Sequence, residues 1–312
     1  MTEAGPSPLR TIGTGLAVAA AAGAGALAWA GLYEVGAYTL RRFDVPVLAP
    51  GSRPVRVLHV SDLHMLPGQH AKQQWVAGLA GLEPDLVVNT GDNHASAQAW
   101  PSVVRCLGRL LDVPGVFVHG SNDYFSPRPK NWLSYLQRGD GEGAVAPIDD
   151  PERALPWQEM DAEFLRRGWH DLTHAEAVVE VAGQRILVRG TDDAHLDLDD
   201  YASVAGPRPD GVTLQLGVTH APYLRVLDAM VADGADLLLA GHTHGGQVCV
   251  PGYGALVTNC DLEPARVKGL SRHVHGDRFA ALHVSAGIGT SPYAPIRFAC
   301  RPEASLLRLV PR

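Results

Sequence analysis

Five short polar motifs in this chain each follow an apolar run, and every motif contains side chains that bind metal ions. The motifs are Asp62-Leu63-His64, Gly91-Asp92-Asn93-His94, Gly120-Ser121-Asn122-Asp123, Thr219-His220 and Gly241-His242-Thr243-His244. Open α/β sheets form their binding sites just outside the carboxyl ends of the strands. The same chemistry at five predicted strand ends therefore indicates a metal-dependent reaction centre.

The candidate metal ligands combine imidazole nitrogens with carboxylate and amide oxygens, and they include no thiolate. They are Asp62, His64, Asp92, Asn122, His220, His242 and His244. This donor set suits Mn, Fe or Zn in a catalytic site better than a structural zinc site. Seven ligands are too many for one tetrahedral ion and suit two divalent metal ions about 3.5–4 Å apart. A mononuclear zinc hydrolase is an alternative, and it would be indifferent to the loss of Asn122.

The segments between the first motifs alternate between strand and helix patterns. Apolar runs at 55–60, 86–89 and 116–118 predict short buried strands, and the spacing at 70–81 and 101–111 predicts helices. Strands that alternate with helices in this way are parallel and are joined by right-handed crossovers. The pattern therefore predicts an α/β fold that brings the motifs to one edge of a sheet.

The rest of the chain is predicted in less detail. Residues 39–47 resemble an edge strand, and the Pro- and Gly-rich stretch 126–157 predicts a long loop near the site, either a lid or an insertion of no consequence. Further elements are a helix at 157–167, strands at 176–182, 185–190, 213–219 and 236–240, and antiparallel strands and turns over 244–309. We divide the chain into an N-terminal segment (1–34), an edge strand and linker (35–54) and one catalytic domain (55–312).

Taken together, the five motifs resemble the calcineurin-like metallophosphoesterase superfamily. The run Gly241-His242-Thr243-His244-Gly245-Gly246-Gln247-Val248, followed by Ser285-Ala286-Gly287-Ile288-Gly289-Thr290-Ser291, is similar to its YkuE-like bacterial branch, which is membrane-associated or exported. The resemblance covers roughly residues 50–310. It implies a four-layer α/β/β/α sandwich with mixed sheets.

The resemblance also implies a role for each ligand. Asp62, His64 and His244 would bind one ion, Asn122, His220 and His242 would bind the other, and Asp92 would bridge them. A hydroxide shared by the ions would attack phosphorus, which implies a dinuclear phosphoesterase acting on a phosphoester or pyrophosphate bond. The substrate would be a phosphorylated small molecule or a lipid.

The third motif departs from the family pattern. The family usually reads Gly-Asn-His-Asp or Gly-Asn-His-Glu, whereas this chain reads Gly120-Ser121-Asn122-Asp123. Ser121 stands where the family has its metal-binding Asn, but we predict Asn122 as the ligand because Ser is a poor neutral ligand. The family His that assists the leaving group is absent, and the candidates to replace it are His94, His119 and His195. A degenerate, membrane-anchored scaffold of the same fold is the alternative function.

The N-terminal segment contains no charged residue from Thr11 to Tyr33. As a helix this run would span roughly 35 Å, which is enough to cross a bilayer. We predict a single-pass membrane anchor whose orientation the flanking charges leave open. A cleaved signal peptide, ending in the small-x-small triplet Ala28-Trp29-Ala30, would instead give a secreted protein, and a buried Ala-rich helix is the third reading. An anchor would favour a lipid-linked substrate.

The overall composition excludes some partners. Net charge is −7 and the isoelectric point is about 6.0, so we expect no nucleic-acid partner. The four cysteines are far apart and form no Cys-x-x-Cys motif, which predicts buried core residues rather than a thiolate metal site.

Overall fold

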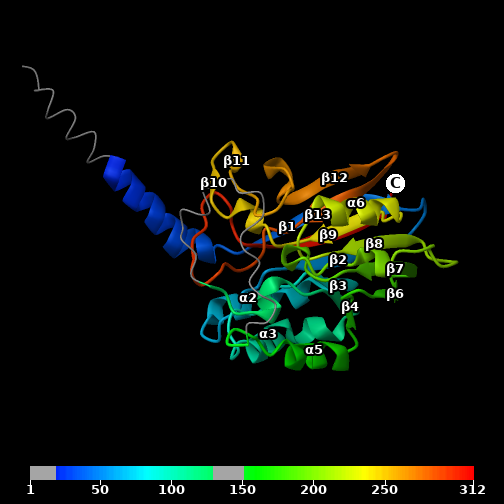
Figure 1. The fold of residues 1–312 in the computed structure, drawn as a ribbon, viewed down its shortest axis with the longest axis horizontal. Coiled ribbons are helices and arrows are strands. Elements are labelled where there is room, and N and C mark those ends of the chain that lie inside the picture. The colour runs from blue at the N-terminus through cyan, green and yellow to red at the C-terminus, as the bar shows by residue number, and fades with distance from the viewer. Residues whose placement is uncertain (1–18, 129–150) are drawn as a thin grey trace, which may run out of the picture.

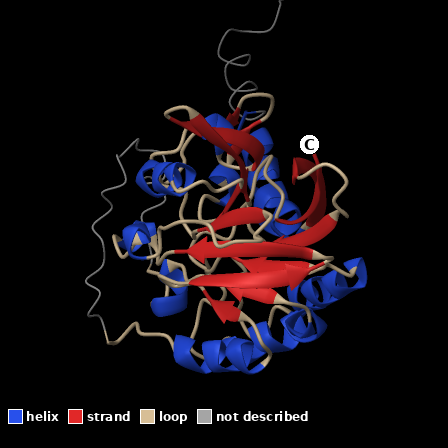
Figure 2. Cartoon of the chain, turned by 90° about the vertical axis from the view of Figure 1, so that its right-hand side faces the viewer, coloured by secondary structure: helices blue, strands red, loops and turns tan. Residues whose placement is uncertain are grey.

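Two six-stranded sheets are stacked face to face, with helices on both outer faces (Figures 1 and 2). This computed structural model describes residues 19–128 and 151–312. The arrangement is the predicted α/β/β/α sandwich. Most of the predicted loop at 126–157 and the first half of the predicted N-terminal anchor lie outside the described residues.

Both sheets are mixed, and each contains four consecutive parallel strands. The first sheet has the spatial order β1 (Thr39–Leu48), β14 (Glu303–Pro311), β2 (Val55–Val60), β3 (Leu86–Asn89), β4 (Gly115–Phe117), β5 (His170–Asp171). The second has the order β12 (Gly269–His275), β13 (Arg278–Val284), β9 (Leu237–Ala240), β8 (Leu214–Val218), β7 (Gln184–Gly190), β6 (Glu176–Val181). The parallel strands are β2–β3–β4–β5 in the first sheet and β13–β9–β8–β7 in the second. A small hairpin pairs β10 (Cys249–Val250) with β11 (Gly254–Ala255).

The central strands are apolar on both faces because each sheet is covered on both sides. Every residue of β3, β8 and β9 is buried. Inward side chains such as Val57 and Leu86 in the first sheet pack against Ile186 and Leu216 in the second. Each large aliphatic side chain buried in this way contributes roughly 1.5–3 kcal/mol to stability. The result is a rigid platform beneath the strand ends.

Amphipathic helices cover the outer faces. The first sheet is covered by α2 (His70–Gly78), α3 (Trp100–Leu107) and α5 (Trp157–Arg166), and the second by α6 (Leu224–Ala232). The short helices are η2 (Glu34–Gly36), η3 (Leu79–Leu82), η4 (Gly108–Asp112), α4 (Ser121–Tyr124), η6 (Ala194–Leu196), η7 (Tyr201–Ser203), η8 (His244–Gly246) and η9 (Pro264–Arg266).

The closing region differs from its prediction as purely antiparallel. The pairs β10–β11 and β12–β13 are antiparallel, but β13 runs parallel to β9. The last strand, β14, enters the first sheet between β1 and β2, parallel to the former and antiparallel to the latter. The sequence does not reveal this because strand pairing over such a separation leaves no local pattern. Strand β5 was also missed, since two residues cannot show an alternation.

The N-terminal helix comprises residues 19–28 and its continuation η1 (Trp29–Tyr33), and it projects away from the body of the molecule (Figure 1). Across residues 19–128 and 151–312, no helix combines the length and the apolar character that crossing a membrane requires. The predicted anchor extends beyond these residues at its N-terminal end. Membrane association stays a prediction.

Candidate metal centre

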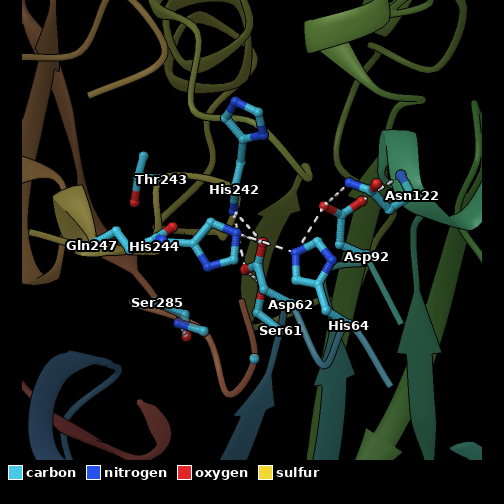
Figure 3. A network of polar contacts seen from close by, with 12 residues as sticks. Ser61, Asp62, His64, Asp92, Asn122, His242, Thr243, His244, Gln247 and Ser285 are labelled. Carbon is cyan, nitrogen blue, oxygen red and sulfur yellow. Dashed lines mark hydrogen bonds and ion pairs between the residues drawn. The ribbon is translucent and has the colours of Figure 1, made fainter. Parts of the chain in front are cut away.

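The stacking of the two sheets brings all five polar motifs together. In each sheet the parallel strands end on the same side, so the loops that follow them converge. The seven predicted ligands come from the loops after β2 (Asp62, His64), β3 (Asp92), β4 (Asn122), β8 (His220) and β9 (His242, His244). Figure 3 shows side chains from both sheets directed toward one another.

Asp62, His64 and His244 form the first group of potential ligands. The Nε2 atoms of His64 and His244 lie 3.1 Å apart, and Nε2 of His244 lies 3.6 Å from Oδ1 of Asp62. One ligand atom from each residue fits within 4.8 Å of the others. These residues could therefore hold one divalent ion.

Asp92 connects this group to a second one. Its Oδ2 lies 3.4 Å from Nε2 of His64, and its Oδ1 lies 3.6 Å from Nε2 of His220. Asp62, Asp92 and His220 also present ligand atoms within 4.8 Å of one another. Asp92 thus contacts one imidazole from each side of the site, where a bridging carboxylate would have to lie.

Asn122 lies against Asp92, and the Ser121 hydroxyl lies behind it. The backbone N–H of Asn122 donates to Oδ1 of Asp92 (2.7 Å), and its Nδ2 donates to Oδ2 (2.8 Å). The Ser121 hydroxyl is 3.3 Å from the same Nδ2. Any metal contact of Asn122 would come from its amide oxygen. The contact with Asp92 favours Asn122 over Ser121 at the third motif, and its role as a ligand stays a prediction.

The donor chemistry fits a metal ion. Nδ1 of His220 lies 2.6 Å from the carbonyl oxygen of Thr90 and must therefore donate its proton there, which leaves the lone pair on Nε2. That Nε2 is buried and has no hydrogen-bond partner. A buried polar atom left without a partner is costly, whereas an imidazole oriented by a carbonyl is the usual arrangement of a metal-binding histidine.

His242 is oriented in the same way. Its Nε2 lies 3.1 Å from the carbonyl oxygen of Asn259, so Nδ1 is the atom left for a metal. The His242 and His220 rings meet edge to face, with centroids 5.1 Å apart. His242 belongs to neither group whose ligand atoms lie within 4.8 Å of one another, so its role as a ligand of the second ion stays a prediction.

Backbone strain is concentrated at these residues. Five of the seven predicted ligands have a positive φ: Asp62 (50°), His64 (40°), Asp92 (55°), His242 (67°) and His244 (48°). Residues other than glycine rarely adopt this conformation, and where they do the strain often belongs to a functional site. The turns after β2, β3 and β9 direct the ligands inward at this conformational cost.

Two glycines allow the loops to approach one another. A Cβ on Gly120 would lie 2.4 Å from Oδ1 of Asp92, and one on Gly241 would lie 1.9 Å from Oγ of Ser61. Either side chain would displace residues of the site. The glycines of the third and fifth motifs are thus required by the close packing of these loops.

The buried charges in the site interact strongly. Burial alone would lower the pKa of His220, but the carboxylates of Asp92, Asp193 and Asp62 raise it to about 9. Burial raises the pKa of Asp62 to about 6 and lowers that of His64 to about 4. Without a metal these carboxylates therefore favour a second proton, on Nε2 of His220, at neutral pH, and a metal ion would have to displace it from that nitrogen.

Asp123 organises the site without being one of the predicted ligands. This fully buried carboxylate accepts hydrogen bonds from the backbone N–H groups of Asp92 (2.7 Å), Asn93 (2.8 Å) and Gly120 (2.9 Å). It holds the loops after β3 and β4 together. In the sequence, only the position of Asp123 as the last, acidic residue of the third motif indicated this role.

Arg297 holds the loop that carries His244, and no sequence motif indicated it. The guanidinium is fully buried and donates to the carbonyl oxygens of Ala286 (2.7 Å) and Gly289 (2.6 Å) and, more weakly, of His244 (3.4 Å). Its Nη2 also lies 3.3 Å from Nδ1 of His244. Arg297 therefore ties the segment 286–289 to the η8 loop.

Two of the three candidate acids are buried. His94 is buried, and its Nε2 lies 3.1 Å from the carbonyl oxygen of Asp123. Both ring nitrogens of His119 are engaged, Nδ1 with the Thr173 hydroxyl (2.9 Å) and Nε2 with the Asp161 carboxylate (3.0 Å). Both nitrogens of His119 are thus occupied by structural partners, whereas Nδ1 of His94 is buried without a hydrogen-bond partner.

The third candidate, His195, borders the metal centre and is half-buried. Its ring centroid lies 4.4 Å from that of His242, and its Nδ1 lies 3.2 Å from the Tyr223 hydroxyl. The carboxylate of Asp193 accepts a hydrogen bond from the backbone N–H of His195 and fixes this turn. Among the three candidates, His195 is the one in contact with a predicted ligand.

A family model described as calcineurin-like phosphoesterase matches residues 55–246, the part of the chain that carries all five motifs. The chain belongs to the calcineurin-like phosphoesterase family. It is accordingly a metal-dependent hydrolase of phosphoric esters, as the family resemblance of the motifs implied. Its predicted ligands are borne by loops that come from both sheets of the family fold.

Individual relatives agree with the family. The chain is 38% identical to phosphodiesterase YaeI of Escherichia coli over 89% of this chain and 90% of that protein. It is 25% identical to the uncharacterized metallophosphoesterase YkuE of Bacillus subtilis over 73% and 68% of the two chains. A bovine transmembrane protein with metallophosphoesterase domain is 26% identical over 66% of this chain, which spans only 44% of that protein's length. The YkuE-like branch was thus assigned correctly.

Proposed function

We propose that this protein is a dinuclear phosphoesterase that hydrolyses a phosphoester or pyrophosphate bond. The position of Asp92 carries the proposal, because its two oxygens lie beside one imidazole from each ligand group. A carboxylate between two such groups is the arrangement that holds a pair of ions a few ångströms apart.

The predicted ligands form two metal-binding positions. Asp62, His64 and His244 would hold one ion, and Asn122, His220 and His242 the other, with Asp92 shared. Two divalent ions bound there would supply Lewis acidity that activates water and neutralises the phosphate oxygens. The donor set admits Mn, Fe or Zn, and metal analysis of the purified protein would identify which is bound.

His195 is our candidate for the proton donor to the leaving group. Its ring lies at the border of the site, against His242, and the Tyr223 hydroxyl and the Asp193 carboxylate fix its position. A proton held there can pass to an oxygen leaving from phosphorus. This would replace the histidine that the third motif lacks.

The first experiment measures hydrolysis of an aryl phosphodiester with and without added divalent metal. Activity should require the metal and should fall about 1000-fold or more in Asp92→Asn, because several kcal/mol of transition-state stabilisation depend on the metal pair. Asp161→Asn is the matched control, since it removes a buried carboxylate of the His119 pair, outside the site. Full activity in Asp92→Asn would overturn the mechanism.

Metal stoichiometry separates this function from the alternatives. The proposal expects about two ions per chain. One ion, together with indifference to Asn122→Ala, would support a mononuclear hydrolase. A chain that binds no metal after reconstitution would support a degenerate scaffold.

The role of His195 is tested with a series of aryl esters of increasing leaving-group pKa. General acid catalysis contributes about 100- to 10,000-fold when the leaving group needs a proton, and little when it does not. His195→Gln should therefore retain activity on the best leaving group and lose it progressively along the series. An equal loss on every ester would show that His195 has only a structural role.

For the substrate we propose a phosphorylated molecule held at a membrane, reached by a protein that is itself membrane-associated through its N-terminal segment. The support is the charge-free run from Thr11 to Tyr33 and the projecting helix at its C-terminal end. Membrane flotation of the full chain from lysed cells tests this, and recovery only in the soluble fraction would overturn it. Secretion after cleavage near Gly31 would appear as a shortened N-terminus.

A further inference from the structure

Three segments of the chain form a surface layer that displays almost no charge. They are residues 19–33, 247–259 and 285–300, of which 285–289 are buried and the rest is largely at the surface, and together we call them the apolar face. Charged residues make up 19% of the whole chain, yet these segments contain only Arg297. Arg297 is fully buried, so the apolar face presents no charged side chain of its own to the surroundings.

The three segments are joined by direct contacts. The backbone N–H of Arg297 donates to the carbonyl oxygen of Ala30 (3.1 Å), which ties the N-terminal helix to the segment 285–300. Nε2 of Gln247 donates to the carbonyl oxygen of Ala294 (2.7 Å), and Val248 pairs with Phe298. The helix base, the loop before β14 and the β10–β11 hairpin thus form one continuous surface at the same end of the molecule (Figure 1).

Large hydrophobic side chains project from this surface. Nine of the fourteen exposed large hydrophobic residues in the described part of the chain belong to it: Leu27, Trp29, Leu32, Tyr33, Val248, Val250, Tyr253, Leu256 and Tyr293. Leu32 is 86% exposed and Tyr253 is 76% exposed. A cluster of this kind on a protein surface marks an interaction site.

The apolar face adjoins the metal centre. Gln247 directly follows η8, which begins with His244. Arg297, from the middle of the face, donates to the carbonyl oxygen of His244, and a Cβ on Gly289 would lie 2.1 Å from the carbonyl oxygen of Leu63. Whatever covers the face therefore comes close to the predicted ligands.

We propose that the apolar face rests on the surface of a lipid bilayer and holds the metal centre at the level of the phosphate groups. The part of this proposal that concerns substrate rests on the proposed function. The face itself is a membrane-docking surface of the catalytic domain, separate from any insertion of the N-terminal segment. Its expected substrate class is a phosphoester carried on a lipid.

A bilayer explains the face better than a protein partner does. The N-terminal helix is apolar and exposed around most of its circumference, whereas a groove on a partner would cover one side only. The exposed aromatic residues Trp29, Tyr33, Tyr253 and Tyr293 are of the two types that concentrate at membrane–water interfaces. The charge-free sequence also continues from the helix back to Thr11.

The experiment places a tryptophan on the face and another away from it. Tyr253→Trp and Phe279→Trp are made separately in the full chain carrying Trp29→Phe, and each is mixed with phosphatidylcholine vesicles with or without brominated acyl chains. Phe279 on β13 is the matched control because it is also aromatic and exposed (55%) but lies outside the face. After subtraction of the parent signal, the tryptophan introduced by Tyr253→Trp should be strongly quenched by brominated lipid and shifted to the blue. The emission added by Phe279→Trp should not change.

Two results would overturn the proposal. If vesicles bind the protein while the Tyr253→Trp emission stays unquenched, the N-terminal segment alone is in the membrane. If the blue shift occurs without vesicles and depends on protein concentration, the face binds a second copy of the chain. Because the readout needs no catalysis, failure of the proposed function would leave it unaffected.

A second measurement uses variants that weaken the face. Tyr253→Ser combined with Tyr293→Ser should reduce the vesicle-bound fraction of the full chain several-fold in flotation assays with dilute lipid. Val274→Ser combined with Phe279→Ser, on the exposed surface of β12 and β13, should leave it unchanged. Thermal unfolding checks that both pairs are folded, and an equal effect of both pairs would contradict a specific docking face.

Discussion

Among the described residues, two regions contain histidine and carboxylate atoms close enough together to hold a metal ion. One is the centre around Asp62, Asp92 and His220, and the other is formed by His119, Asp161 and Asp171. In the first, Nε2 of His220 is buried without a hydrogen-bond partner, and in the second both nitrogens of His119 are hydrogen-bonded. The first cluster is open for a cation, while the second is already satisfied by its own atoms.

The two clusters also differ in backbone strain, which only one of them, the metal centre, shows. Five predicted ligands of the metal centre have positive φ, whereas the three residues of the His119 cluster do not. Strain persists where surrounding structure enforces it, and it commonly marks function. An imidazole nitrogen without a hydrogen bond, together with backbone strain, therefore distinguishes a binding site from a structural ion pair. The distance between the atoms does not make this distinction.

The largest expected difference between the clusters is in metal content. His220→Gln should remove one of the two ions and lower phosphodiester hydrolysis about 100-fold or more, because it takes a ligand from the metal pair. His119→Gln should keep both ions. Metal analysis after dialysis measures this, and loss of an ion from the His119 variant would erase the distinction between the clusters.

The His119 cluster should instead contribute pH-dependent stability. Although burial opposes it, the Asp161 carboxylate raises the pKa of His119 to about 9 from an unfolded value near 6.5. The stabilisation is thus complete below about pH 6.5 and lost as the pH rises through about 9, with an upper limit of about 3 kcal/mol.

Denaturant unfolding of the metal-loaded protein at pH 6 and pH 9.5 measures this effect. Bound metal keeps His220 from titrating in the same range. His119→Gln should show a smaller decrease between the two pH values than the parent chain. Parallel curves for the two proteins would mean that the His119–Asp161 pair carries no net charge interaction.

The smallest expected effect concerns Arg297, which is not itself a predicted ligand but contacts the loop that carries His244. Residues that support metal ligands typically change affinity about 10- to 100-fold when mutated. Arg297→Met should weaken the binding of one ion by that factor, since the η8 loop with His244 loses its tie to segment 286–289. Arg297→Lys should restore part of the affinity. Competition with a chelator measures this, and unchanged affinity in Arg297→Met would limit Arg297 to folding.

Much of the fold could be predicted from local pattern. The strands at 55–60 and 86–89 agree with β2 and β3 because fully buried strands are continuous apolar runs with sharp polar ends. The placement of β14 between β1 and β2 could not be predicted, since pairing partners so far apart in the chain share no periodicity.

Some residues of the candidate site could likewise be predicted from the sequence, and others could not. Its predicted ligands were visible because Asp, His and Asn at strand ends have a chemical signature that does not depend on context. Asp123 and Arg297 were not assigned, because their roles consist of hydrogen bonds to backbone atoms of other loops. His94, His119 and His195 looked equivalent as sequence, and only packing separated the two buried rings from the half-buried one beside His242.

The sequence by itself determined the set of candidate metal-binding side chains, because residue type fixes donor chemistry, and the resemblance of its motifs to a known family implied the reaction class. The sequence also determined the charge-free character of the segments at 19–33, 247–259 and 285–300. Only the tertiary structure decided that Asp92 lies between two ligand groups and that these three segments form one surface beside them. Both facts depend on contacts between residues far apart in the chain, which long-range packing establishes and local pattern does not encode.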